Sequence, residues 1–243
     1  KSIEPSLTGD YYGGFYCPGD ATGDIHRFSS GLAAVTEKLG VTYRFGMEAS
    51  AVQLDDKGVR ILLKPSEENM DKPADTVEML NADAIVVCGG VGSYQLAEML
   101  GDRVNVYPVK GYSITVELKD DASQAHAPWV SLLDESAKIV TSRLGAGRLR
   151  VAGTAEFNGY NRDIRSDRIQ PLTDWVNKNF ELSTEFVVPW AGLRPMMPDM
   201  MPRVDRGKRE RVFYNTGHGH LGWTLSAATA AMISQQVAQS HPV

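Results

Sequence analysis

The sequence contains only two cysteines, Cys17 and Cys88, among its 243 residues. Two cysteines cannot build a disulfide framework, and their positions lack metal-ligand spacing, so we expect two reduced thiols without a catalytic role. No apolar run reaches the roughly 18–20 residues that cross a membrane, and the first five residues lack the apolar run of a signal peptide. These absences predict a cytoplasmic protein, either soluble or in peripheral contact with a membrane.

The sequence also lacks an excess of basic residues. Lysine and arginine number 25 against 30 aspartate and glutamate residues, which gives a formal net charge of −5. A nucleic-acid-binding surface needs a basic face to neutralise phosphates, so this class of partner is excluded. The 42% hydrophobic and 23% charged residues are ordinary for a globular protein and exclude a disordered, collagen-like or coiled-coil chain.

The first half of the chain contains one helix-strand pattern and one apolar strand that ends in glycines. Apolar residues at three- and four-residue spacing predict a helix over 26–39, with Asp24 as its N-cap. Strands are expected at 41–45, 50–55 and 59–63, followed by a polar surface loop over 65–76. The apolar run 84–88 leads into glycines and a helix over 94–100, which is typical of a buried parallel strand ending at a ligand crevice.

The middle of the chain changes to alternating strands with tight turns. Strands at 112–118, 139–143 and 149–152 indicate an antiparallel sheet, and 168–180 has the spacing of an amphipathic helix. The last third returns to a strand over 211–215, a glycine loop and a helix over 223–237. We therefore predict an α/β protein in which two α/β segments flank an antiparallel insert, forming two discontinuous domains that share one cleft.

The glycine loop from Gly217 to Gly222 matches the G-x-G-x-x-G dinucleotide fingerprint between a strand and a helix. That fingerprint also requires an acidic residue about 20 positions later to hold the ribose, and no Asp or Glu follows Glu210. An NAD site is therefore excluded, which leaves an ordinary tight turn or another ligand. Because exposed N–H groups at a helix N-terminus favour negative charge, the loop suits a ligand such as a flavin that gains electrons. His218 and His220 lack a third ligand, so no metal is expected.

Arg194 lies in an apolar stretch and is fixed by the proline that follows it. One interpretation is a structural salt bridge, with Asp199 as an internal partner. The other is a bidentate clamp for a substrate carboxylate, because the guanidinium fork matches that group geometrically. The G-x-S-x-G nucleophile motif is absent, and no Ser/His/acid set can be recognised by spacing.

Several motifs together resemble the FAD-dependent D-amino-acid oxidase/dehydrogenase family, in particular its bacterial dehydrogenases. The resemblance runs almost from end to end, and its two C-terminal motifs are the most specific. The motifs are Cys17-Pro18-Gly19-Asp20-Ala21-Thr22-Gly23-Asp24, Val106-Tyr107-Pro108-Val109-Lys110-Gly111-Tyr112-Ser113, Leu133-Asp134-Glu135, Gly192-Leu193-Arg194-Pro195 with Pro198-Asp199, and Asn215-Thr216-Gly217-His218-Gly219-His220-Leu221-Gly222-Trp223-Thr224.

The resemblance implies a role for each matching position. Arg194 corresponds to the arginine that binds the substrate carboxylate, and Tyr112 and His220 are expected to contact the substrate. No side chain is assigned as an acid or base, and no metal is expected. The residues expected to surround FAD are Cys88, Gly89, Gly90, Gly217, His218, Gly219, His220, Leu221, Gly222, Trp223 and Thr224.

The implied activity is oxidative deamination of a D-amino acid to a 2-oxo acid and ammonia. Electrons are expected to pass to a quinone or another carrier, which requires peripheral contact with the inner membrane. Two alternatives stay open. One is an oxidase or dehydrogenase of a secondary amine of the sarcosine, glycine or hydroxyproline type, and the other is a non-catalytic module or subunit whose flavin half lies on another chain.

The chain departs from the family pattern in one respect. It lacks the N-terminal βαβ unit whose glycine-rich turn holds the FAD pyrophosphate. We expect an incomplete FAD-binding domain over 23–105 and 196–243 and a substrate-binding domain over 1–22 and 106–195. The strand at 85–87 should then expose apolar surface, and the Arg194 guanidinium should face the cleft between the two domains.

Overall fold

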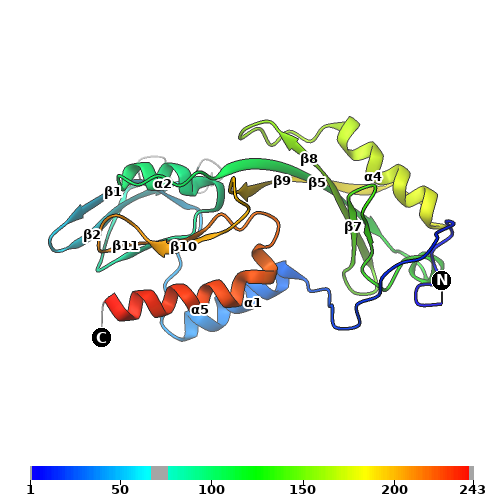
Figure 1. Cartoon of the computed structure of the whole chain (residues 1–243), viewed down its shortest axis with the longest axis horizontal. Helices are drawn as coiled ribbons and strands as arrows, with labels where there is room; N and C mark the ends of the chain where they lie inside the picture. Colours follow the sequence, from blue (N-terminus) through cyan, green and yellow to red (C-terminus); the bar gives the residue numbers. More distant parts are fainter. Residues whose placement is uncertain (1, 67–75, 241–243) are drawn as a thin grey trace. The chain divides into compact units, whose positions relative to one another are not determined.

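A computed structural model describes residues 2–66 and 76–240 and shows a mixed α/β fold (Figure 1). Its helices are α1 (Ile25–Lys38), α2 (Ser93–Met99), α3 (Asp121–His126), α4 (Ser166–Asn179) and α5 (Gly222–Ser240), with a 3-10 turn η1 (Gly90–Gly92). Its strands are β1 (Met47–Asp55), β2 (Gly58–Pro65), β3 (Glu78–Ala82), β4 (Ile85–Val87), β5 (Tyr107–Glu117), β6 (Leu133–Asp134), β7 (Ile139–Arg143), β8 (Arg148–Phe157), β9 (Val187–Met196), β10 (Arg203–Arg206) and β11 (Val212–Thr216). The predicted α/β class is confirmed.

The chain divides into two compact units, each assembled from two separate stretches. The first unit comprises Lys1–Leu32 and Val109–Leu193, and the second comprises Ala33–Pro108 and Arg194–Val243. This division places Arg194 in the second unit. The boundaries expected from the sequence were 22/23, 105/106 and 195/196, which would place Arg194 in the substrate-binding domain. All three passages between the units fall inside regular elements, namely α1, β5 and β9.

The first unit is built on the five-stranded sheet β6-β7-β8-β5-β9. Strands β5, β7 and β8 pair antiparallel, as the alternating pattern predicts. One face of the sheet packs against α4, because Leu149 and Val151 of β8 and Leu172 and Val176 of α4 are all fully buried in one cluster. Burial of such side chains is worth about 1.5–3 kcal/mol each and is the main stabilising term of this unit.

The second unit contains two three-stranded sheets, β1-β2-β3 and β10-β11-β4. β4 pairs with β11 in a parallel arrangement, which confirms the parallel strand predicted at 84–88. Figure 1 shows α2 and α5 on opposite sides of the β10-β11-β4 sheet. The core of this unit includes Val87, Val212 and Tyr214 from that sheet and Ala97 from α2.

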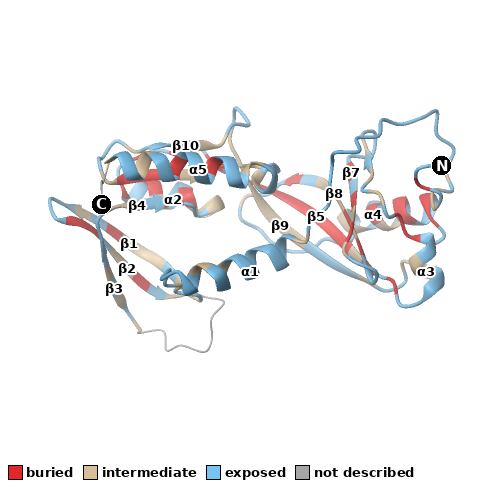
Figure 2. Cartoon of the chain, turned by 90° about the horizontal axis from the view of Figure 1, so that it is seen from below, coloured by how far each residue is buried: buried red, intermediate tan, exposed pale blue. Residues whose placement is uncertain are grey.

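Helix α1 is confirmed, one residue earlier than predicted at each end. The Asp24 side chain accepts a hydrogen bond from the amide of Arg27 at 3.2 Å, which is the N-cap contact. The helix contains no buried residue, and Figure 2 shows it exposed along its length. Its apolar stripe is therefore uncovered, with Phe28 50% and Val35 55% exposed.

The strand predicted over 41–45 is wrong. Residues 41–44 are irregular and β1 begins only at Met47. The Tyr43 hydroxyl lies 2.6 Å from Thr36 Oγ1 of α1, and its ring stacks on Phe45 with centroids 5.1 Å apart. The aromatic residues thus fold the segment back onto the helix instead of into a sheet. Most of the loop predicted over 65–76 lies outside the described residues.

Strand β4 lies at an edge of its sheet, where β11 is its only strand partner among the described residues. Val86 is 38% exposed, whereas Val87 on the opposite face is 2% exposed. This matches the expectation that the strand exposes apolar surface.

Candidate functional site

The glycine loop connects β11 to α5 and is bonded to the end of β9. Gly217 and Gly219 have φ values of +79° and +56°, and residues other than glycine rarely adopt this backbone conformation. The Gly219 amide donates to the Pro195 carbonyl at 3.0 Å, and Met196 forms an antiparallel bridge with His218. Since Pro195 follows Arg194, the loop and the predicted carboxylate clamp are adjacent within the second unit.

The loop packs closely on two methionines. A Cβ placed on Gly217 would lie 2.6 Å from Met197 Cγ, and one on Gly219 would lie 2.8 Å from Met196 Sδ. Real Cβ atoms essentially never come this close to another heavy atom. Both glycines are therefore favoured by their positive φ, and a side chain at either position would also displace a methionine.

His218 is oriented by a hydrogen bond to α5. Its Nε2 lies 3.1 Å from Oγ1 of Thr229, which is buried and donates its own proton to the Leu225 carbonyl at 3.1 Å. Because that hydroxyl proton is already used, Nε2 is the donor to Oγ1, and the neutral ring carries its proton on Nε2. Burial lowers the pKa of His218, which favours this neutral form. His220, in contrast, is exposed.

The carboxyl ends of β4 and β11 meet at one edge of their sheet because the two strands are parallel. Cys88, Gly89 and Gly90 follow β4, and the glycine loop follows β11. Behind them, the hydroxyls of Ser93 and Thr216 form a buried hydrogen bond of 2.7 Å. The parallel strands thus bring together the two segments predicted to surround a cofactor.

This edge has groups that fit a flavin ring. The side-chain oxygen of Asn215 is buried without a hydrogen-bond partner, which is an uncommon state for a buried acceptor. The first amides of α5, beginning at Gly222, have no intrahelical partner. A flavin carries an N–H group and carbonyl oxygens along one edge. The Asn215 oxygen can accept from that N–H group, and the amides of α5 can donate to the carbonyl oxygens. The residues that would hold it are Asn215 and the loop from Gly217 to Thr224.

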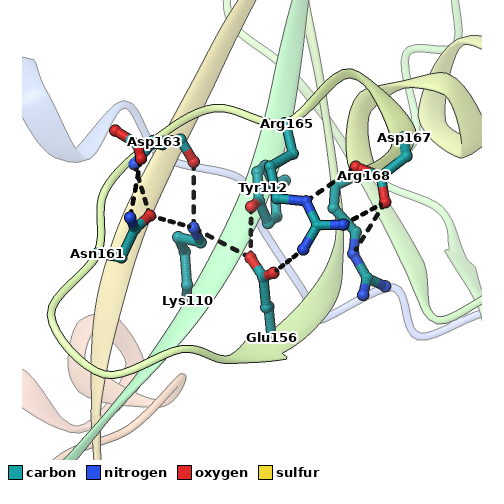
Figure 3. Close-up of polar contacts among 8 residues, drawn as sticks. All are labelled: Lys110, Tyr112, Glu156, Asn161, Asp163, Arg165, Asp167 and Arg168. Carbon is teal, nitrogen blue, oxygen red and sulfur yellow. Dashed lines mark hydrogen bonds and ion pairs between the residues drawn. The ribbon is translucent and has the colours of Figure 1, made fainter.

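Tyr112 lies in the first unit inside a charged network (Figure 3). It is 1% exposed, and its hydroxyl donates to Glu156 Oε2 at 2.5 Å. Lys110 Nζ lies 3.0 Å from the same oxygen, and Arg165 donates to Glu156 Oε1 at 2.7 Å. Tyr112 thus has its hydroxyl committed to Glu156, and its contact with a substrate stays a prediction.

Lys110 is a completely buried lysine with three acceptors. Besides Glu156, its Nζ donates to the Asn161 side chain at 3.0 Å and to the Asp163 carbonyl at 3.1 Å. Burial opposes the charge of Lys110, but its contacts with Tyr112 and Glu156 raise its pKa. Hydrogen bonds from Tyr112 and then from Lys110 lower the pKa of Glu156 to about 2. The network is therefore ionised at neutral pH and fixes the segment after β8.

The sequence did not identify Lys110, Glu156, Asn215 or Thr229 as functional residues. Lys110 and Glu156 are register partners on β5 and β8. The available signal for this pair was a charged residue of opposite sign in each of two otherwise largely apolar strands. The contact between His218 and Thr229 left no comparable signal. In the part of the chain that the structure describes, no three His, Cys, Asp or Glu side chains are arranged to hold a metal ion. Among the same residues, no helix combines the length and apolar character needed to span a membrane.

Residues 1–236 match the model of the FAD dependent oxidoreductase (DAO) family. The chain belongs to this family. It is 56% identical over 242 residues to D-amino acid dehydrogenase 3 of Mesorhizobium japonicum, covering 99% of this chain and 57% of the relative. It is 38% identical to the D-amino acid dehydrogenase of Dechloromonas aromatica, covering 99% of this chain and 56% of the relative. The chain therefore spans little more than half the length of these relatives.

Solved structures share the fold at low sequence identity. A glycine oxidase from Geobacillus kaustophilus superposes with a TM-score of 0.70 at 18% identity, covering 88% of this chain and 54% of that protein. An L-proline dehydrogenase from P. horikoshii superposes with a TM-score of 0.69 at 12% identity, covering 89% of this chain and 56% of that protein. An L-alpha-glycerophosphate oxidase from Mycoplasma pneumoniae with FAD bound superposes with a TM-score of 0.68 at 16% identity, covering 86% of this chain and 54% of that protein.

Proposed function

We propose that the protein containing this chain is an FAD-dependent D-amino acid dehydrogenase. It converts a D-amino acid to a 2-oxo acid and ammonia and passes the electrons to a quinone or another carrier at the membrane. The observation that carries the proposal is the hydrogen bond between Pro195 and Gly219, which joins the arginine strand to the glycine loop. The high identity to D-amino acid dehydrogenases over 99% of the chain supports the choice of substrate.

The two units have separate tasks in this proposal. The second unit, with the glycine loop, holds the flavin ring, and the first unit, with Tyr112, supplies the substrate-binding sheet. FAD, when bound, supplies the acceptor for the hydrogen and two electrons that leave the substrate Cα. In this proposal Asn215 and the loop from Gly217 to Thr224 hold the ring end of the cofactor.

Arg194 binds the substrate carboxylate through its two parallel N–H donors. In this proposal the loop backbone lines the position of the substrate Cα. The loop is held by its bonds to Pro195 and, through His218, to Thr229. No general base is assigned, because an amino acid whose amine is already neutral needs no side chain to remove a proton. The chain thus contributes binding and orientation, which can supply a large part of a rate enhancement.

Turnover of the full-length protein by a panel of amines tests this proposal. D-alanine and other D-amino acids are compared with sarcosine, glycine and hydroxyproline isomers, using an artificial dye and oxygen as alternative electron acceptors. We expect D-amino acids to reduce the dye much faster than they reduce oxygen. Faster turnover of sarcosine would favour the secondary-amine activity instead. A colourless protein that FAD cannot reconstitute would favour a non-catalytic subunit.

A further inference from the structure

The five-stranded sheet of the first unit has a second face that does not pack on α4. Along β8, the buried Leu149 and Val151 alternate with Arg150, so Arg150 points to this second face. Val140 of β7 and Trp190 of β9 are 39% and 54% exposed. We call this surface the open face and define it by Thr115, Val140, Ser142, Arg150 and Trp190.

Arg150 lies at the centre of a polar row across the open face. The strand register pairs it with Ser142 of β7 on one side and with Thr115 of β5 on the other. Its guanidinium carbon lies 5.1 Å from the centroid of the Trp190 ring. Because β5 separates β8 from β9 in the sheet, the arginine reaches across Thr115 to meet the tryptophan.

Arg150 differs from Arg143, Arg148 and Arg165 of the same unit in the partners of its guanidinium. Arg165 binds Glu156 and Asp167, and Arg148 lies 3.2 Å from Asp24. Arg143 has no close carboxylate but donates to four backbone carbonyl groups. Within the residues that the structure describes, Arg150 has no carboxylate or carbonyl partner. Burial lowers its pKa with no opposing charge to raise it, although an arginine stays protonated at neutral pH.

The geometry leaves the best donors of Arg150 available. The guanidinium lies over the Trp190 ring, and its N–H groups have no carboxylate or carbonyl acceptor among the described residues. Two parallel N–H groups match the two oxygens of a carboxylate. The neighbouring hydroxyls of Ser142 and Thr115 can donate to the same group, and Val140 with the Trp190 ring offers apolar surface for a short carbon chain. One positive charge suits a monoanion better than a phosphate dianion.

We propose that Arg150, which lies over the Trp190 ring and is flanked by Ser142 and Thr115, is a binding site for the carboxylate of a small organic acid. Two sources can supply such a group, an amino acid or a 2-oxo acid. No carboxylate pairs with Arg150 among the described residues, and Glu117, two residues from Thr115 on β5, is paired with Lys119 at 3.5 Å. The site therefore suits a 2-oxo acid better. This inference is independent of the proposed function, because it concerns binding alone.

Side-chain NMR on the ¹⁵N-labelled full-length protein tests the proposal. The Nε–H signal of Arg150 is assigned by its loss in Arg150→Lys, and the indole signal of Trp190 by its loss in Trp190→Phe. The ligands are acetate, pyruvate, D-alanine and D-alaninamide, each titrated at constant ionic strength with chloride as the reference anion. We expect saturable shifts of both signals with acetate and pyruvate, weaker shifts with D-alanine and none with D-alaninamide.

Variants separate this site from Arg194. Arg150→Gln should weaken pyruvate binding, followed through the Trp190 signal, by about tenfold or more, because a charged hydrogen-bonded pair is lost. Arg194→Lys should leave the response of the Arg150 signal unchanged. If Arg150→Gln does not fold, Trp190→Phe keeps the charge and an aromatic ring and should retain the shift of the Arg150 signal. Shifts no larger than those with chloride, or a Trp190 response that survives Arg150→Gln, would overturn the proposal.

Discussion

The amide of Gly219 is bonded to the carbonyl of Pro195 at 3.0 Å. This bond joins two segments that lie 24 positions apart in the sequence, the arginine strand β9 and the glycine loop. The backbone next to Arg194 therefore cannot move independently of the loop. A change in the conformation of either segment should therefore alter the conformation of the other.

Replacing Arg194 by Lys should not behave as a conservative change in the full-length holoenzyme. Lysine keeps the charge but loses the bidentate fork, and alanine loses both. Removing one partner of a desolvated charge pair costs on the order of 2–5 kcal/mol, or roughly 30- to several-thousand-fold in kcat/KM. Steady-state kinetics measure the loss, and the visible spectrum should show normal flavin content. A kcat/KM near that of the wild type would assign Arg194 to a structural salt bridge.

Replacing Gly217 by Ala should destabilise the protein. The φ of +79° and the close approach of Met197 Cγ both oppose a side chain here, at a cost of about 1–3 kcal/mol. Gly147→Ala is the matched control, since a Cβ there would meet no atom within 4 Å. Denaturant unfolding of the two variants measures the difference. Equal stability of both variants would contradict the conformational requirement at Gly217.

Replacing Thr229 by Val should release the ring of His218. Valine has the shape of threonine without the hydroxyl that accepts from Nε2. Long-range ¹⁵N–¹H NMR of the ring should show the Nε2–H tautomer in the wild type and a mixture of tautomers in the variant. Thr229→Ser, which retains the hydroxyl, should keep the single tautomer. An Nδ1–H tautomer in the wild type would contradict the hydrogen-bond assignment.

The buried pair of Lys110 and Glu156 should make stability depend on acid pH. The pKa of Glu156 is lowered from 4.5 to about 2 in the folded state. Its contribution is therefore fully present above pH 4.5 and is lost as the pH falls from 4.5 towards 2. Glu156→Gln should lower Tm at pH 7 by on the order of 10 °C. The difference from the wild type should shrink across that acid range.

Exposed Glu185 provides the control for this prediction. Glu185→Gln should leave Tm within a few degrees of the wild type at every pH, because surface charges contribute little to stability. Thermal unfolding followed by circular dichroism between pH 2 and pH 7 measures both variants. A constant difference between Glu156→Gln and the wild type over this range would show that the pKa of Glu156 is the same in the folded and unfolded states.

Local patterns in the sequence predicted the elements around the site. The spacing of apolar residues and the Asp24 cap predicted α1, and the apolar run before Cys88 predicted the parallel strand β4. Alternation at 41–45 predicted a strand that does not form, because Tyr43 and Phe45 stack on each other and Tyr43 bonds to Thr36. Side-chain contacts within a short segment thus overrode the pattern.

Contacts between distant segments were beyond prediction from one sequence. Lys110 meets Glu156 because β5 and β8 pair in one particular register, and no local signal fixes that register. Arg150 meets Trp190 only because β9 joins the sheet beyond β5. The candidate residues of the glycine loop were recognisable because their motif is contiguous, whereas the residues that support them are scattered along the chain.

The three passages of the chain between its two units, inside α1, β5 and β9, have a practical consequence. Neither unit corresponds to one uninterrupted stretch of sequence, so no simple truncation of the gene can produce either unit alone. The passages also lie in the hydrogen-bonded backbone of regular elements. Proteases cleave such backbone more slowly than exposed linkers. Limited digestion should therefore fail to release the units as separate fragments, and expression trials must keep both stretches of each unit together.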